Sequence, residues 1–222
     1  MKTLKFMRNP LRSLGLFFVL MPFGSSFAQN QHHETTLDKI VETTFVVKDF
    51  DVWRPQFLKD SLMRKQYGID TFITISKIGE PHYIMNVATV DDVANAKKAM
   101  NNHATHSMEA MREMSGVKNV YYQVVRFVPS PNGTKWMIMN HRVKDFDTWF
   151  AGFQKGKSIR DAAGLVDVLV ARNIDDPNMV QVVNDITDMK KAKEFPHSKI
   201  LKKRMKMAGV IGTPEVAYYE TR

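Results

Sequence analysis

In this 222-residue chain, His141 is the strongest candidate for a catalytic or ligand-binding side chain, and Asn140 is its neighbour. An imidazole titrates near neutral pH, so its surroundings can make it a general acid, a general base or an anchor for a ligand. We therefore predict that His141 and Asn140 are catalytic residues that line or flank a small-molecule site. The alternative is a hydrogen-bonded histidine with a structural role.

His103 and His106 could hold a metal ion. They stand three positions apart in a region predicted as helical, and this spacing places both rings on one face of a helix. Four methionines surround them, at positions Met100, Met108, Met111 and Met114. Thioether sulfurs favour Cu(I), so a copper site is one interpretation. The other is that the methionines fill the core and the histidines are solvated.

Arg64 and Arg160 are candidate ligand-binding residues, because a guanidinium can bind a carboxylate through two parallel hydrogen bonds. Each lies near the end of a predicted helix. There a cation also interacts favourably with the helix dipole, which is the structural alternative.

These candidates belong to a sequence that repeats itself. VKDFDVW at residues 47–53 returns as VKDFDTW at residues 143–149, an offset of 96 residues (143 − 47). The same offset relates Arg64 to Arg160 and Phe45 to His141. The chain is therefore a duplicated folding unit. His141 stands where the two copies differ, which is where a function could have broken the symmetry.

Each copy has the pattern of a β-α-β-β-α-β unit. In the first copy, residues 42–48, 71–78, 83–89 and 117–128 are predicted strands. Asp49 is the expected cap of the first helix and Gly68 its end, and the second helix is expected to reach Gly116. This order predicts an α+β fold of two ferredoxin-like repeats, each with both helices on one face of its sheet.

The uncovered face of each sheet must be buried. We expect the two repeats to pair sheet to sheet as an intramolecular pseudo-dimeric α+β barrel, with a ligand cavity between them or with that space filled by side chains. The strand residues expected to line this interior are Phe45, Val47, Ile84, Met137, Met139, Val180 and Val182.

The chain begins with features of a secretory signal peptide. Residues 1–28 combine a basic start, a short apolar run and small residues before a predicted cut after Ala28. The apolar run is shorter than a membrane span. We predict a periplasmic or secreted protein without a membrane anchor after cleavage. A flexible lead-in (29–37), the first repeat (38–128), a linker (129–134) and the second repeat (135–222) follow.

Composition narrows the function classes. The net charge of +9 falls to about +5 without the four basic residues of the signal, which indicates solubility and no nucleic-acid partner. The chain has no cysteine, which excludes thiol catalysis and cysteine-ligated metals. Motifs for nucleotide cofactors, serine hydrolysis and zincins are absent, so no cofactor is predicted. We expect a monomer with an internal pseudo-dimer, and further dimerisation is left open.

The second copy resembles the dimeric α+β barrel superfamily, near its antibiotic-biosynthesis-monooxygenase-like branch. The resemblance is carried by HRVKDFDTW at residues 141–149, with Phe153 and Arg160, and continues at Ala163–Leu165, Asp176–Asn178 and Met207–Val210. It implies the fold predicted above. Members include cofactor-free monooxygenases, haem-degrading enzymes and cyclases, so the resemblance leaves open whether this chain is an enzyme.

Three functions follow as hypotheses. The first is an exported protein that binds a small apolar or aromatic molecule between the repeats, or a cofactor-independent, monooxygenase- or cyclase-like enzyme acting on one. The second is a non-catalytic periplasmic interaction module. The third is a periplasmic haem or copper handling protein.

Overall fold

The computed structural model describes residues 37–130 and 132–222. The predicted signal peptide (1–28) and, apart from Leu37, the predicted lead-in (29–37) lie outside the described residues. In the part of the chain that is described, no helix is both long and apolar enough to cross a membrane.

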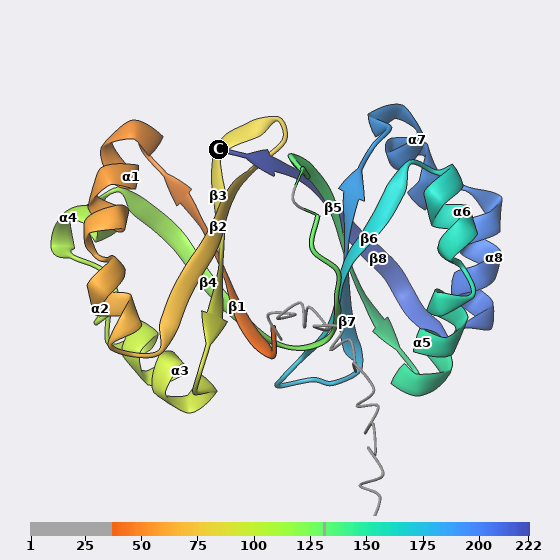
Figure 1. Ribbon diagram of the computed structural model, residues 1–222, viewed down its shortest axis with the longest axis horizontal. Helices are drawn as coiled ribbons and strands as arrows, with labels where there is room; N and C mark the ends of the chain where they lie inside the picture. Colours follow the sequence, from red (N-terminus) through yellow and green to blue (C-terminus); the bar gives the residue numbers. More distant parts are fainter. Residues whose placement is uncertain (1–36, 131) are drawn as a thin grey trace, which may run out of the picture. The chain divides into compact units, whose positions relative to one another are not determined.

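The described chain consists of two β-α-β-β-α-β repeats, as predicted, and each predicted helix is divided into two short helices (Figure 1). Repeat 1 contains β1 (Lys39–Val47), α1 (Phe50–Lys59), α2 (Ser61–Lys65), β2 (Ile69–Lys77), β3 (Glu80–Val90), α3 (Val93–Asn101), α4 (Met108–Arg112) and β4 (Met114–Phe127). Repeat 2 contains β5 (Lys135–Val143), α5 (Phe146–Gln154), α6 (Lys157–Ala162), β6 (Leu165–Asn173), β7 (Met179–Ile186), α7 (Met189–Glu194), a 3-10 turn (Phe195–His197), α8 (Lys199–Met207) and β8 (Val210–Thr221).

The repeated motif folds in the same way in both copies. The Asp49 carboxylate accepts hydrogen bonds from the backbone N–H groups of Asp51 (2.8 Å) and Val52 (3.2 Å), and Asp145 accepts one from Thr148 (2.8 Å). These contacts satisfy donors that a helix start leaves free. The predicted cap is therefore confirmed.

Gly68 and Gly164 turn the chain from the first helical pair into the next strand. Their φ angles are 68° and 70°, a region that side chains rarely adopt. A Cβ on Gly164 would also lie 2.6 Å from the Cβ of Asp188. Only glycine allows the approach that brings α6 back onto its sheet.

The eight strands form one closed barrel in the order β1-β3-β2-β8-β5-β7-β6-β4. Each repeat contributes four antiparallel strands, and the two sheets join where β2 pairs with β8 and β4 pairs with β6. The helices of each repeat cover the outer face of that repeat's own sheet (Figure 1). The predicted fold class is confirmed.

The barrel interior is packed with side chains from both repeats. The buried residues of this interior cluster all lie on strands, and they include Ile40, Met85, Tyr122, Ile138 and Tyr219. The residues predicted to line this space pack instead beneath the helices: Phe45, Val47 and Ile84 in repeat 1, and Met137, Met139, Val180 and Val182 in repeat 2. That assignment was wrong because alternation along a strand shows which residues share a face, but it does not show which of the two faces meets the helices.

Candidate functional site

A cavity of about 630 Å³ lies in repeat 2, between the outer face of the sheet and the helices that cover it. This position differs from the predicted one between the repeats. The sheet contributes Met137, Met139 and Val182 to the wall, and the helices contribute Trp149, Phe153, Ile159, Leu201 and Met205. Lys155, Lys203 and Arg204 also line it. Such an apolar cavity with few polar groups is typical of a small-molecule site.

His141 is part of this cavity wall. Its side chain is buried, and its ring centroid lies 5.3 Å from that of Trp149. Within the described part of the chain, neither ring nitrogen has a hydrogen-bond partner. Burial lowers the pKa of His141 to about 4, so the ring is neutral at pH 7. A neutral imidazole offers one acceptor and one donor, and no group among the described residues engages either of them.

Asn140 does not join His141 in the cavity. The two residues are neighbours on β5, so their side chains leave opposite faces of the sheet. Asn140 is absent from the cavity wall, and its buried Oδ1 atom has no hydrogen-bond partner. The structure therefore separates the two residues that were predicted to act together.

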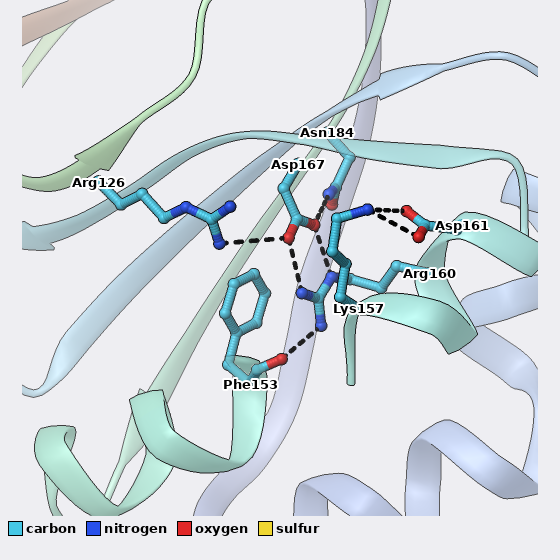
Figure 2. Close-up of polar contacts among 7 residues, drawn as sticks. All are labelled: Arg126, Phe153, Lys157, Arg160, Asp161, Asp167 and Asn184. Atoms are coloured by element: carbon cyan, nitrogen blue, oxygen red, sulfur yellow. Dashed lines mark hydrogen bonds and ion pairs between the residues drawn. The ribbon is translucent and has the colours of Figure 1, made fainter. Parts of the chain in front are cut away.

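Arg160 also borders the cavity, but its guanidinium is already paired (Figure 2). Its Nε and Nη2 atoms donate to the two carboxylate oxygens of Asp167 at 2.6 and 2.7 Å, and Nη1 donates to the Phe153 carbonyl at 2.8 Å. Asn184 donates to Asp167 at 3.0 Å, and Arg126 lies 3.6 Å from the same carboxylate. Arg160 thus holds α6 against β6 and has no free pair of donors for a ligand carboxylate.

Arg64, at the matching position of repeat 1, lacks such a partner. Its side chain is buried, and its guanidinium carbon lies 3.7 Å from the centre of the Phe57 ring. Burial lowers the pKa of Arg64 to about 10, and its Nη1 atom has no hydrogen-bond partner among residues 37–130 and 132–222. Two arginines that look equivalent in the sequence are therefore in different electrostatic environments.

His103 and His106 line a second cavity, of about 520 Å³, in repeat 1. They do not share a helix face, because α3 ends at Asn101 and His103 has a φ of 55° in the turn that follows. Three of the four methionines, Met100, Met111 and Met114, line the same cavity.

The surroundings of His106 bear on the copper interpretation. Its Nδ1 atom lies 2.8 Å from the Thr105 hydroxyl, and burial together with the charge of Arg64 lowers its pKa to about 4. A neutral ring can bind a metal, but the nearby cation opposes one. Among the described residues, no group of three or more histidine, aspartate or glutamate side chains could hold a metal. Copper binding stays a prediction, which a Cu(I) titration would test.

Sequence reasoning missed a polar pair inside the barrel. Gln181 donates from Nε2 to Glu42 at 2.9 Å, and both side chains are buried. Burial raises the pKa of Glu42 to about 7, although the hydrogen bond from Gln181 lowers it. Comparison of the two copies could have identified Glu42, because its counterpart in the second copy is the apolar Ile138. Asp167, the partner of Arg160, was missed as well.

Comparison with known proteins supports the fold. No family model and no curated protein match the sequence. A candidate monooxygenase from Lactobacillus acidophilus superposes with a TM-score of 0.54 and 10% identity, over 82% of this chain and 93% of that chain. An anthrone oxidase-like protein gives 0.54 and 8%, over 84% and 92%. A haem-binding protein from Thermus thermophilus gives 0.50 and 11%, over 82% and 91%. At these identities the likeness concerns the fold alone, and the fold that the resemblance to dimeric α+β barrel proteins implied is confirmed.

Proposed function

We propose that the cavity of repeat 2 binds a small, largely apolar or aromatic molecule that carries a hydroxyl or another weakly acidic group. The observation that carries this proposal is His141, a buried neutral imidazole with both nitrogens unpartnered in the wall of a cavity of about 630 Å³. Buried polar groups without partners are costly, so a ligand that hydrogen-bonds His141 gains that energy on binding.

The rest of the wall supports the same ligand class. Met137, Met139 and Phe153 offer contacts to a flat apolar body, and Lys155, Lys203 and Arg204 supply positive charge. Those cations would favour a ligand that is anionic or becomes anionic. The helix α8, which contributes part of this wall, has no buried residue and could move to admit the molecule.

Oxygenation without a cofactor is the reaction that fits such a site. His141 would accept a proton from an activated aromatic methylene group, and the resulting carbanion would reduce O2. One oxygen atom would remain as a carbonyl and the other would leave as water. The fold shared with a candidate monooxygenase and an anthrone oxidase-like protein supports this choice. A pKa of about 4 makes free His141 a weak base, so the negative charge of the bound ligand has to raise that pKa during the reaction.

We predict that His141→Phe weakens ligand binding and leaves the fold intact. Phenylalanine already occupies the matching position in repeat 1, where Phe45 packs 5.1 Å from Trp53. The variant should be at least as heat-stable as the parent, because two unpartnered buried nitrogens disappear. Its affinity for the fluorescent probe 1-anilinonaphthalene-8-sulfonate should fall about tenfold, as expected for one lost hydrogen bond and a filled cavity.

The matched control is His82→Phe, because His82 is exposed on β3. Oxygen uptake with anthrone, measured on the same three proteins, tests catalysis. Equal probe binding by the parent and His141→Phe would show that the ligand does not bind at His141. Probe binding without oxygen uptake would show a binding protein that does not catalyse this oxygenation.

Haem handling is the second candidate, because an imidazole nitrogen without a hydrogen-bond partner is also what haem iron binds. His141 has such a nitrogen in the cavity wall. Purified protein mixed with haem would show a Soret band that shifts on binding in the parent and not in His141→Phe. An interaction module without a ligand would show neither haem nor probe binding.

We also propose that the protein is exported and that residues 1–28 are removed. Their basic start, short apolar run and Ala28 support this proposal. Intact-mass measurement of the protein from a bacterial host should find a chain that begins at Gln29. A chain that retains Met1 and stays with the cytosolic fraction would contradict export.

A further inference from the structure

Repeat 1 contains two arginines near one phenylalanine ring, and no acid among the described residues forms an ion pair with either of them. The guanidinium carbons of Arg64 and Arg54 lie 3.7 and 5.8 Å from the centre of the Phe57 ring. Among residues 37–130 and 132–222, no ion pair joins either arginine to a carboxylate. Arg54 donates to the Thr74 hydroxyl at 2.7 Å, which leaves its charge uncompensated.

Asp70 and Asp60 both act on Arg64 through space, but Asp70 pairs with Lys65 at 3.2 Å and Asp60 is also engaged elsewhere. Its Oδ2 atom accepts hydrogen bonds from the backbone N–H of Ser107 (2.8 Å) and from the Ser107 hydroxyl (2.9 Å). Arg64 is only 4% exposed, so water does little to solvate its charge. A buried cation without a directly bonded anion is unfavourable, so an anion that binds beside Arg64 would be favoured.

Repeat 2 shows what the missing group looks like. There Arg160 stacks 3.6 Å from the Phe153 ring, as Arg64 stacks on Phe57, and the Asp167 carboxylate binds its guanidinium edge (Figure 2). Asp167 lies opposite Asn184 on the neighbouring strand.

At the same register of repeat 1, Thr71 lies opposite Ala88. The carboxylate and the amide of repeat 2 are thus replaced by a short hydroxyl and a methyl group. Repeat 1 therefore has the arginine without the acid.

Two further side chains that pack against the Phe57 ring each have a buried nitrogen without a hydrogen-bond partner among the described residues. Trp53 stacks on Phe57 with centroids 4.8 Å apart, and its Nε1–H donor has no partner. The His106 ring packs 5.8 Å from Phe57, and its Nε2 atom has none. His106 is the member of this cluster that lines the cavity of about 520 Å³, and it connects that cavity to the Phe57 ring.

We propose that Arg64 and Arg54 bind the carboxylate group of a small organic acid, in the place that the Asp167 side chain fills in repeat 2. The indole of Trp53 adds a hydrogen bond to that carboxylate, and the adjoining cavity of about 520 Å³ takes the rest of the molecule. A carboxylate fits better than a metal, because the arginines repel cations and a planar guanidinium matches a planar carboxylate. This site is separate from the cavity that contains His141.

Sodium acetate and sodium benzoate are suitable probes, titrated into the purified full-length protein against sodium chloride at equal ionic strength. At ten times the dissociation constant, binding should raise the melting temperature by about 3 °C. Arg64→Met should abolish this rise, and calorimetric titration should show the affinity reduced more than tenfold. The exposed Arg112→Met is the control and should respond like the parent.

Thr71→Asp is a more specific test, because it places an aspartate at the position that Asp167 occupies in repeat 2. It should melt at a higher temperature than the parent without any probe and should no longer respond to acetate or benzoate. The proposal is overturned if neither carboxylate shifts the parent's melting temperature beyond the chloride control. It is also overturned if Arg64→Met responds like the parent.

Discussion

Arg160→Met is expected to lower the free energy of unfolding by about 3–5 kcal/mol, because it leaves the Asp167 carboxylate buried without its bidentate partner. Asp167 is only 5% exposed, and Arg126, at 3.6 Å, and Asn184, at 3.0 Å, cannot replace two short hydrogen bonds. Asp167→Asn should cost a similar amount. Urea denaturation followed by circular dichroism would measure both.

The matching change in repeat 1 provides the internal comparison. Arg64→Met keeps an unbranched side chain and removes the guanidinium over Phe57, a cation that has no directly bonded anion among the described residues. Its effect should lie within about 1 kcal/mol of zero, or be stabilising. The double variant Arg160→Met/Asp167→Leu should recover most of the loss caused by Arg160→Met. If Arg64→Met and Arg160→Met cost the same, the two arginines do not differ as described.

Glu42→Gln is expected to stabilise the protein by about 3 kcal/mol at pH 8 and to have little such effect at pH 4. Burial raises the pKa of Glu42 from its ordinary 4.5 to about 7. Between these values the folded protein binds more protons than the unfolded chain, so stability falls as the pH rises. The loss is complete above about pH 7, where folding must bury a carboxylate that prefers water.

The local contacts support glutamine as the replacement. Gln181 donates to Glu42 through Nε2, while its own Oε1 atom is buried without a partner. A glutamine at position 42, like a protonated glutamate, can donate to that oxygen and complete the pair.

The measurement is the difference in unfolding free energy between Glu42→Gln and the parent, from urea denaturation at several pH values from 4 to 8. His106 and His141 act in the opposite sense, because burial lowers the pKa of each from 6.5 to about 4 and so makes the fold less stable in acid. Both histidines are present in the two proteins, so their contributions cancel in the difference. A difference that does not change with pH would show that Glu42 keeps its ordinary pKa when folded.

The architecture followed from the sequence because its determinants are local and occur twice. A cap at Asp49 and Asp145, the aromatic helix stripe and a glycine at Gly68 and Gly164 each act within a few residues. Finding them at one constant offset predicted two ferredoxin-like units, and the need to bury each open sheet face predicted the barrel.

The candidate site was predicted only in part. His141 was singled out because the two copies differ there, and it does line a cavity. The cavity was expected on the wrong side of the sheet, because alternation along a strand shows which residues share a face but not which face meets the helices.

The sequence did not predict which arginine forms an ion pair with a carboxylate. Arg64 and Arg160 occupy equivalent positions, and only the tertiary structure shows that Asp167 neutralises one of them and that Thr71 stands in the acid's place beside the other. Local periodicity therefore determined the fold of this protein. Contacts between strands and helices, which set burial and charge pairing, decided which of its polar residues are free to bind a ligand.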